Sequence, residues 1–149
     1  MFQATRAHQT HTIEIALPVE CCFPLFTPQG ETQWVSDWAP DYIYPPSGKT
    51  EQGMVFITGH GGETTLWTLV DYQLEIHYAR YSRVTPGSRS TLVEVQCEEV
   101  RQGLTKVTVS YTLNGLSEAG NQAIAEFCDD AYREMIEEWR TLIEQRCLG

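Results

Sequence analysis

Residues 119–143 read AGNQAIAEFCDDAYREMIEEWRTLI and decide the fold. Apolar side chains recur at offsets of three and four, and charged side chains fill the opposite side, which is typical of an amphipathic helix. The apolar stripe consists of Ile124, Phe127, Cys128, Ala131, Met135, Trp139, Leu142 and Ile143. We expect one continuous helix from Ala119 onward, capped by Ser117, with about 28 residues and a length of about 42 Å. A helix this long must bury its stripe against an equally long surface.

The segment before this helix, residues 50–115, consists of predicted strands. Ser90–Glu98 and Lys106–Leu113 alternate apolar and polar residues, so each strand has one buried and one solvated face, as in an antiparallel sheet covered on one side. Glycine and proline mark the turns between strands. The other strands are predicted at Thr12–Leu17, Asp41–Tyr44, Gly53–Gly59, Thr64–Tyr72 and Ile76–Val84.

Two short helices are predicted between the first and second strands. Pro18 suits the start of a helix over Val19–Phe26, and a second one spans Gln29–Val35 with Trp34 facing inward. The order of one strand, two short helices, six strands and one long helix predicts an α+β fold, in which a bent antiparallel sheet grips the C-terminal helix. A gripped helix leaves a space beneath it, and there we expect the functional site.

Length and charge limit the class of protein. Residues 1–149 are predicted to form one domain, with residues 1–10 as a flexible tail. Ten basic and twenty acidic residues give a formal net charge of −10, which argues against nucleic-acid and anionic-membrane partners. No stretch approaches the ~18 apolar residues of a membrane span, and Met1–Thr12 lacks the apolar core of a signal peptide, so we expect a cytoplasmic protein.

Several stretches of the chain carry a resemblance to a known superfamily. They are PLFTP (24–28), WVSDW (34–38), GMVFITGH (53–60), RVTPG (83–87) and YTLNGLSEAGN (111–121). From about His11 to Leu148 the chain resembles the START-like superfamily, also called SRPBCC or the birch-pollen-allergen fold, and within it a bacterial branch labelled polyketide cyclase/dehydrase-like. The resemblance implies a helix-grip fold with a seven-stranded curved antiparallel sheet and a ligand cavity under the C-terminal helix. It does not specify the chemistry, because the superfamily includes lipid carriers, hormone receptors, cyclases and co-chaperones.

Aromatic side chains supply the candidate ligand-binding residues. As a cavity lining they would give an apolar pocket with a few hydroxyl groups, the usual composition of a small-molecule site. As plain core they would fill the space between sheet and helix. Both interpretations stay open for each residue. The candidate set is Trp34, Trp38, Phe56, Trp67, Tyr78, Tyr111, Phe127, Met135 and Trp139.

His60 and Arg80 are the candidate catalytic residues. His60 stands in His60-Gly-Gly-Glu63 at a strand end, where an imidazole and a carboxylate can share a proton; the alternative is an exposed glycine turn. Arg80 shares strand parity with Ile76 and Tyr78 and would enter the cavity if they point inward. There it would anchor a carboxylate or enolate; the alternative is a solvated arginine.

Three classes of function remain. The first hypothesis is binding of a small hydrophobic or aromatic ligand, such as a lipid or a polyketide-like metabolite, by a monomer or homodimer. The second is a cyclase or dehydratase acting on a polyketide-like substrate through His60, Tyr78 and Arg80. The third is a co-chaperone-like interaction module. No catalytic triad, phosphate loop, dinucleotide fingerprint or zinc cluster is present in the sequence, so we expect neither cofactor nor metal and place binding first.

Overall fold

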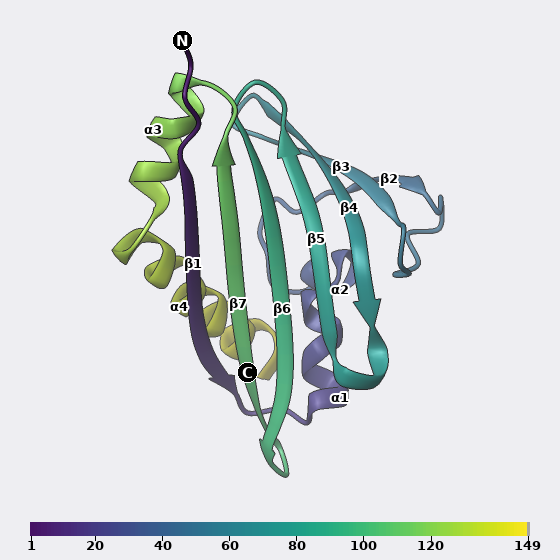
Figure 1. Cartoon of the computed structure of the whole chain (residues 1–149). Coiled ribbons are helices and arrows are strands. Elements are labelled where there is room, and N and C mark those ends of the chain that lie inside the picture. The colour runs from purple at the N-terminus through teal and green to yellow at the C-terminus, as the bar shows by residue number, and fades with distance from the viewer. Residues whose placement is uncertain (149) are drawn as a thin grey trace.

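Seven antiparallel strands form a single curved sheet in the computed structural model, which describes residues 1–148 (Figure 1). The strand order is β1-β7-β6-β5-β4-β3-β2, so the first strand lies beside the last one and the others follow in reverse sequence order. The strands are β1 (Arg6–Ile15), β2 (Asp41–Tyr44), β3 (Val55–His60), β4 (Glu63–Gln73), β5 (Tyr78–Thr85), β6 (Arg89–Arg101) and β7 (Leu104–Gly115).

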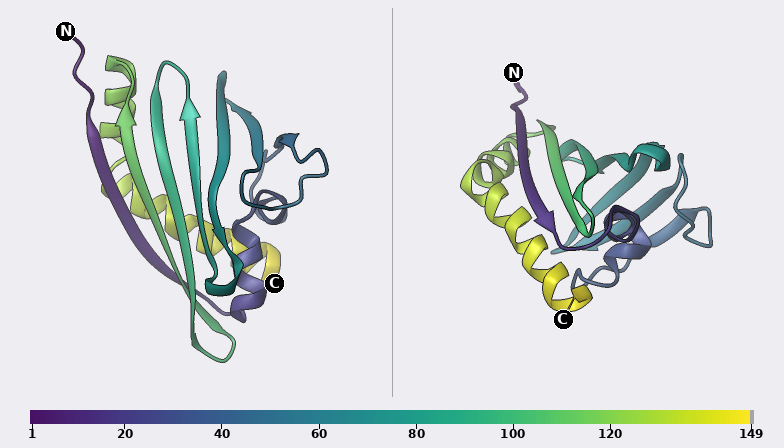
Figure 2. Two further views of the ribbon diagram at one scale, coloured as in Figure 1. Left: turned by 45° about the vertical axis from the view of Figure 1, so that its right-hand side comes forward. Right: turned by 90° about the horizontal axis from the view of Figure 1, so that it is seen from below.

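Helices cover one face of this sheet and leave the other face bare. The views in Figure 2 show the long helix α4 lying across the inner face, with the short helices at the far end of the sheet. This arrangement is the helix-grip fold that the sequence predicts. The helical elements are α1 (Val19–Cys22), the 3-10 turn η1 (Phe23–Phe26), α2 (Pro28–Glu31), the 3-10 turn η2 (Leu74–Ile76), α3 (Glu118–Phe127), α4 (Asp130–Ile143) and the π turn η3 (Glu144–Leu148).

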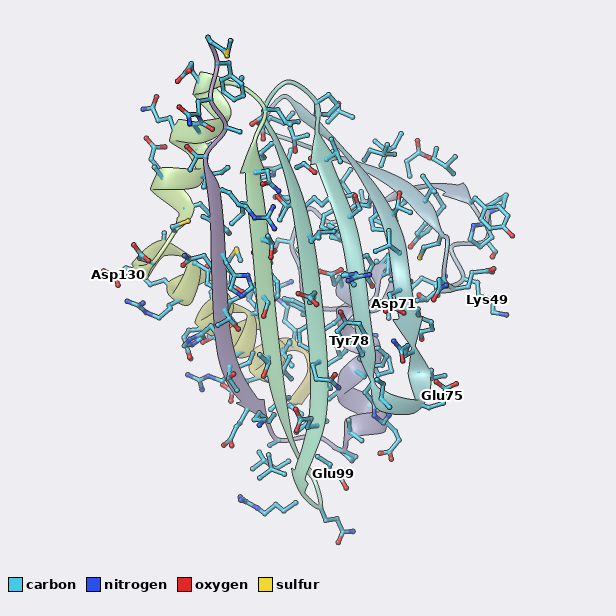
Figure 3. The ribbon with its side chains drawn as sticks, viewed as in Figure 1. Lys49, Asp71, Glu75, Tyr78, Glu99 and Asp130 are labelled. Atoms are coloured by element: carbon cyan, nitrogen blue, oxygen red, sulfur yellow. The ribbon has the colours of Figure 1, made fainter. Side chains whose placement is uncertain are left out.

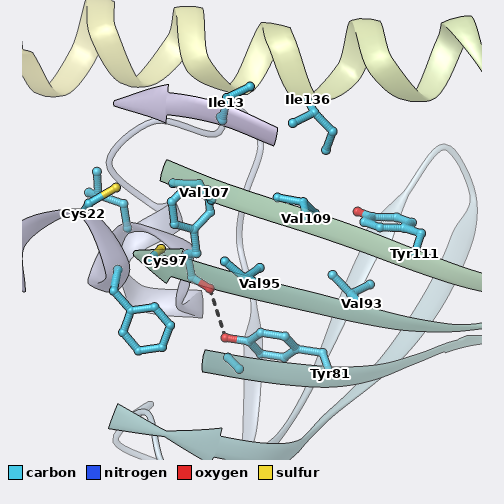
Figure 4. Packing of buried hydrophobic residues seen from close by; sticks show 14 of the residues in the cluster. Ile13, Cys22, Tyr81, Val93, Val95, Cys97, Val107, Val109, Tyr111 and Ile136 are labelled. Atoms are coloured by element: carbon cyan, nitrogen blue, oxygen red, sulfur yellow. Dashed lines mark hydrogen bonds between the residues drawn. The ribbon is translucent and has the colours of Figure 1, made fainter. Parts of the chain in front are cut away.

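The core lies between the central strands and α4. Strands β6 and β7 alternate as predicted, and their inner side chains face Ile136 of α4, which is fully buried (Figure 4). The hydroxyl of Tyr132, also on α4, donates a hydrogen bond to the carbonyl oxygen of Val109. This bond and the surrounding apolar contacts fix the helix to the sheet. The inner side chains of the two strands are Val93, Val95, Cys97, Val107, Val109 and Tyr111.

The predicted flexible tail over residues 1–10 is wrong for residues 6–10, because β1 already begins at Arg6. It pairs with β7 from Arg6 opposite Asn114 to Ile15 opposite Thr105. Two inner-face side chains at the start of β1 are polar and bond the C-terminal segment: Gln9 accepts from the backbone N–H of Asp129 at 2.7 Å, and His11 lies 2.7 Å from Glu137. The strand therefore lacks the apolar alternation on which a strand prediction depends.

The long C-terminal helix is present, but it is divided into α3 and α4. Ser117 caps α3 as predicted, since its hydroxyl accepts from the N–H of Gly120 at 3.0 Å. Cys128 is extended and Asp129 has φ 63° and ψ −115°, which ends one helix and starts the other. The break also shifts the buried stripe of α4, so that Tyr132 is buried and Ala131, a member of the predicted stripe, is exposed.

Asp129→Gly should raise the free energy of unfolding by about 1 kcal/mol. A side chain at φ 63° and ψ −115° is strained by about 1–3 kcal/mol, and glycine adopts this conformation without a Cβ clash. Urea unfolding followed by circular dichroism measures the change. Asp130→Gly is the control, because residue 130 is helical and glycine there should lower stability by about 1 kcal/mol. Equal effects of the two substitutions would contradict the expectation.

Candidate ligand cavity

A cavity of about 370 Å³ lies between the inner face of the sheet, the segment around α2, and α4. It reaches the surface at the β3–β4 turn, where His60 and Glu63 line it and are exposed. The apolar part of its wall comes from η1, the loop after α2, β4, β6 and α4. Its apolar members are Phe26, Val35, Trp38, Trp67, Val93, Val95, Met135 and Trp139.

The aromatic wall is built around Trp67 of β4. Its ring stacks on Phe56 at 5.4 Å between centroids and meets the edges of Trp38 at 5.8 Å and Tyr81 at 6.0 Å. The indole N–H of Trp67 bonds the hydroxyl of Thr58, and that of Trp38 bonds the carbonyl of Pro28 at 2.8 Å. The indoles of Trp38 and Trp67 are thus held in place by both packing and a hydrogen bond.

Apart from Tyr78, the sequence-predicted ligand-binding residues fall into three groups. Trp38, Trp67, Tyr111, Met135 and Trp139 line the cavity. Trp34 and Phe56 are fully buried behind its wall, where they support the lining residues and do not reach the cavity. Phe127 lines a smaller neighbouring cavity of about 220 Å³ that also touches Tyr111.

The prediction that Tyr78 and Arg80 face the cavity is wrong. On β5 the buried side chains are those of Ala79, Tyr81 and Thr85, so residues 78 and 80 lie on the outer face, which Figure 3 shows from the side away from α4. The Tyr78 hydroxyl donates to the carboxylate of Glu94 at 2.6 Å, and Arg80 pairs in register with Glu94 and Asp71. Neither residue is in position to contact a bound ligand.

The error lies in the inward orientation that the prediction assigns to Ile76. Ile76 belongs to the η2 turn and is exposed, whereas the ring of His77 meets the buried Phe23 at 5.7 Å between centroids. The alternation continues into β5, so Ile76, Tyr78 and Arg80 all lie on the outer face. The arginine of β5 that does line the cavity is Arg83, on the same face as Tyr81.

Arg83 is the first functional side chain that sequence reasoning missed. It pairs in register with Trp67, and its guanidinium carbon lies 5.2 Å from the centre of that ring, a cation–π contact. Within residues 1–148 no carboxylate oxygen lies within 4.0 Å of it. By contrast, Arg89 at the same end of the cavity makes a two-point contact with Glu63, with both N–O distances 3.3 Å.

Glu31, the last residue of α2, is the second missed residue. It lines the cavity, and burial raises the pKa of its carboxyl to about 8, while the charge of Arg83 acts in the opposite direction. A carboxyl with such a pKa is mostly protonated at pH 7 and hence neutral. The sequence held a signal for it, since Glu31 precedes the inward-facing Trp34 by three residues and shares its helical face.

Two tyrosines complete the polar part of the cavity. The Tyr81 hydroxyl donates to the carbonyl oxygen of Phe26 at 3.1 Å, the bond drawn dashed in Figure 4. Burial raises the pKa of Tyr81 well above its ordinary value, and burial also raises that of Tyr111. Both phenols stay neutral at physiological pH, so they offer hydrogen bonds without charge.

Solved structures share this fold at low sequence identity. Norcoclaurine synthase from Thalictrum flavum, in complex with dopamine and hydroxybenzaldehyde, has a TM-score of 0.67 at 9% identity over 95% of this chain and 88% of that one. Ara h 8.0201 has a TM-score of 0.68 at 13% identity over 97% and 99%. A hypothetical protein from Helicobacter pylori has a TM-score of 0.71 at 9% identity over 95% and 88%.

These similarities show a helix-grip fold, and they confirm the START-like resemblance at the level of the fold. Neither a protein-family model nor a curated protein matches the sequence. None of the helices within residues 1–148 is long and apolar enough to cross a membrane. The chemistry of the cavity must therefore be argued from its own residues.

Proposed function

We propose that the protein binds a small aromatic molecule carrying an anionic oxygen in the cavity between the sheet and α4. The observation that carries this proposal is a cavity of about 370 Å³ walled by Trp38, Trp67 and Trp139. Natural ligand pockets of about 300–1,000 Å³ combine such apolar walls with a few polar groups that fix the ligand's orientation. The Thalictrum flavum structure holds small aromatic molecules, which are of a size that this cavity suits.

Arg83 supports the anionic part of the proposal. It is a cavity-lining cation without a salt bridge in the described part of the chain, whereas Arg89 is neutralised by Glu63. A guanidinium offers a planar fork of donors that fits a carboxylate, sulfonate or phenolate oxygen. Because Glu31 is mostly neutral at pH 7, it does not cancel the attraction of Arg83 for an anion.

Arg83→Met should weaken binding of an aromatic anion by about 10- to 100-fold, since a hydrogen bond to a charged group contributes about 1.5–3 kcal/mol. The probe is 8-anilinonaphthalene-1-sulfonate, and its uncharged analogue N-phenyl-1-naphthylamine should bind the variant within about threefold of the wild type. Binding is followed by quenching of tryptophan fluorescence, because three of the four tryptophans line the cavity.

Arg80→Met is the matched control for this measurement. Arg80 lies on the same strand but on the outer face, so its removal should leave both affinities unchanged. Circular dichroism confirms that each variant is folded. The proposal fails if neither dye binds saturably, or if Arg83→Met and Arg80→Met affect the sulfonate equally.

A further inference from the structure

Glu31 is held at the cavity by an unusually tight local structure. Thr27 caps α2 by accepting from the N–H of Gly30 at 3.1 Å. Gly30 packs so closely on the preceding turn that an added Cβ would lie 1.8 Å from the carbonyl oxygen of Pro24. The N–H groups of Trp34 and Val35 both donate to the carbonyl oxygen of Glu31. The backbone of Glu31 is therefore fixed on both sides, which holds its side chain at the cavity.

The carboxyl group of Glu31 has no hydrogen-bond partner among residues 1–148, although it lies in largely apolar surroundings. Every fully buried side-chain oxygen or nitrogen in the described part of the chain is bonded, except Nε of Arg80 on the outer face. The carboxyl oxygens of Glu31 are not among these fully buried atoms, so they are accessible, and Glu31 lines the cavity. A carboxyl that is free of protein hydrogen bonds and lines a cavity is available to bond a ligand.

Arg83 acts on the same carboxyl from across the cavity. Its charge opposes the effect of burial on Glu31, so the two groups interact, yet they do not form a salt bridge within 4.0 Å. Both side chains line the same cavity. The carboxyl of Glu31 can carry a proton, and the guanidinium of Arg83 is a cation without a salt bridge. A proton-transfer group and a cation that binds an oxyanion are the two elements of an enolising site.

We propose that Glu31 is the acid–base group of a proton-transfer site that enolises small aryl-substituted carbonyl compounds, with Arg83 binding the oxyanion that forms. This inference rests on the proposed binding function and adds a reaction to it. The aromatic wall around Trp67 positions the aryl group, and the cavity excludes bulk water from the reacting atoms.

The reaction transfers one proton and needs no oxidant. The ionised carboxylate of Glu31 removes a proton from the carbon beside the carbonyl; the C–H electron pair becomes a C=C bond, and the carbonyl π pair moves onto oxygen. The guanidinium of Arg83 stabilises this enolate oxygen. The protonated Glu31 then returns a proton to the carbon or to the oxygen, which regenerates the carboxylate. Exchange with solvent through the open end of the cavity replaces the proton on Glu31.

The protonation state of Glu31 suits this task. Its pKa of about 8 lies near physiological pH, where a group can both accept and donate a proton efficiently. Tyr42, Tyr81 and Tyr111 approach the same carboxyl from β2, β5 and β7, and burial raises the pKa of all three, so they do not titrate in this range. The charged or titratable side chains that also line the cavity are Asp37, His60, Glu63, Arg83 and Arg89.

Phenylpyruvate is a suitable probe because it combines an aryl ring, an acidic benzylic CH₂ and a 2-oxo acid. Exchange of its benzylic protons in D₂O, followed by proton NMR, measures enolisation directly. The wild-type protein should accelerate exchange over buffer, and Glu31→Gln should reduce the acceleration by about 100-fold, the usual effect of removing a general base. Glu98→Gln, which changes an exposed glutamate on the outer face of β6, should leave the exchange rate unchanged.

The dependence of the rate on pH gives a second test that needs no variant. Exchange by the wild type should rise with pH and level off above about 8, as the carboxylate of Glu31 forms. The inference is overturned if the wild type does not accelerate exchange, if Glu31→Gln matches the wild type, or if the profile lacks this inflection. Dye binding on the same samples separates the two proposals, because normal binding without exchange removes only the catalytic one.

Discussion

The protein should lose stability as pH rises from about 5 to 8, and Glu31→Gln should remove most of this loss. The pKa of Glu31 is raised from 4.5 to about 8 in the folded state, chiefly by burial. A raised pKa means that the folded protein binds the proton more tightly than the unfolded chain. The contribution of this proton to the free energy of unfolding is therefore fully present below pH 4.5 and is lost as pH rises through about 8. At about 1.4 kcal/mol for each pH unit, the loss is roughly 3–4 kcal/mol.

Urea unfolding of the wild type and Glu31→Gln at several pH values between 5 and 9 measures this effect. Near pH 5 the two proteins should be similarly stable, because protonated glutamate and glutamine are both neutral. Near pH 8.5 the variant should be the more stable, and Glu98→Gln should follow the wild type throughout. If the free energies of unfolding of the wild type and Glu31→Gln fell in parallel as pH rises, burial would not be raising the pKa of Glu31.

Two other carboxylates act in a different pH range and do not obscure this result. A hydrogen bond from Arg89 lowers the pKa of Glu63, and one from His11 lowers that of Glu137. Lowered values make the folded protein bind these protons less tightly than the unfolded chain does. Their contributions are thus present above the ordinary glutamate pKa of 4.5 and are lost only as pH falls below it.

The fold could be predicted because its strongest patterns are local. Alternation in Ser90–Glu98 and Lys106–Leu113 and the helical stripe after Ala119 place the sheet and the helix that it grips. The start of β1 could not be read in this way, because two of its inner-face side chains are polar and bond the C-terminal segment. His11, for example, lies 2.7 Å from Glu137 of α4. Such a pairing joins residues far apart in the sequence and leaves no periodic signal.

The cavity was harder to predict than the fold because the sequence of β5 does not show which of its two faces is buried. Arg80 and Arg83 stand three residues apart on β5, so only one of them lies on the inner face. Each face of β5 carries one tyrosine and one arginine, Tyr78 and Arg80 outside and Tyr81 and Arg83 inside, so its alternation does not indicate which face is buried. The oxyanion-binding guanidinium that we propose in the cavity is therefore that of Arg83 and not that of Arg80.

Trp34→Ala should lower the free energy of unfolding by about 3–5 kcal/mol, the usual cost of removing a large buried aromatic side chain. Trp34 is fully buried, and its ring meets Phe26 at 5.8 Å and Trp139 at 5.7 Å between centroids. Its indole N–H donates to the carbonyl oxygen of Leu25 at 2.8 Å, an acceptor that the substitution leaves unbonded. Urea unfolding measures the loss.

Trp34→Ala should also lower the pKa of Glu31 toward the ordinary value of a glutamate carboxyl. The buried indole of Trp34 packs behind the cavity wall three residues after Glu31, so removing it admits water beside α2. Hydration favours the charged carboxylate, which lowers the pKa and flattens the decline of stability with pH. Trp34→Phe keeps the ring and should lose only about 1–2 kcal/mol while preserving that decline. If Trp34→Ala retained the full pH dependence, the burial of Glu31 would not depend on this tryptophan.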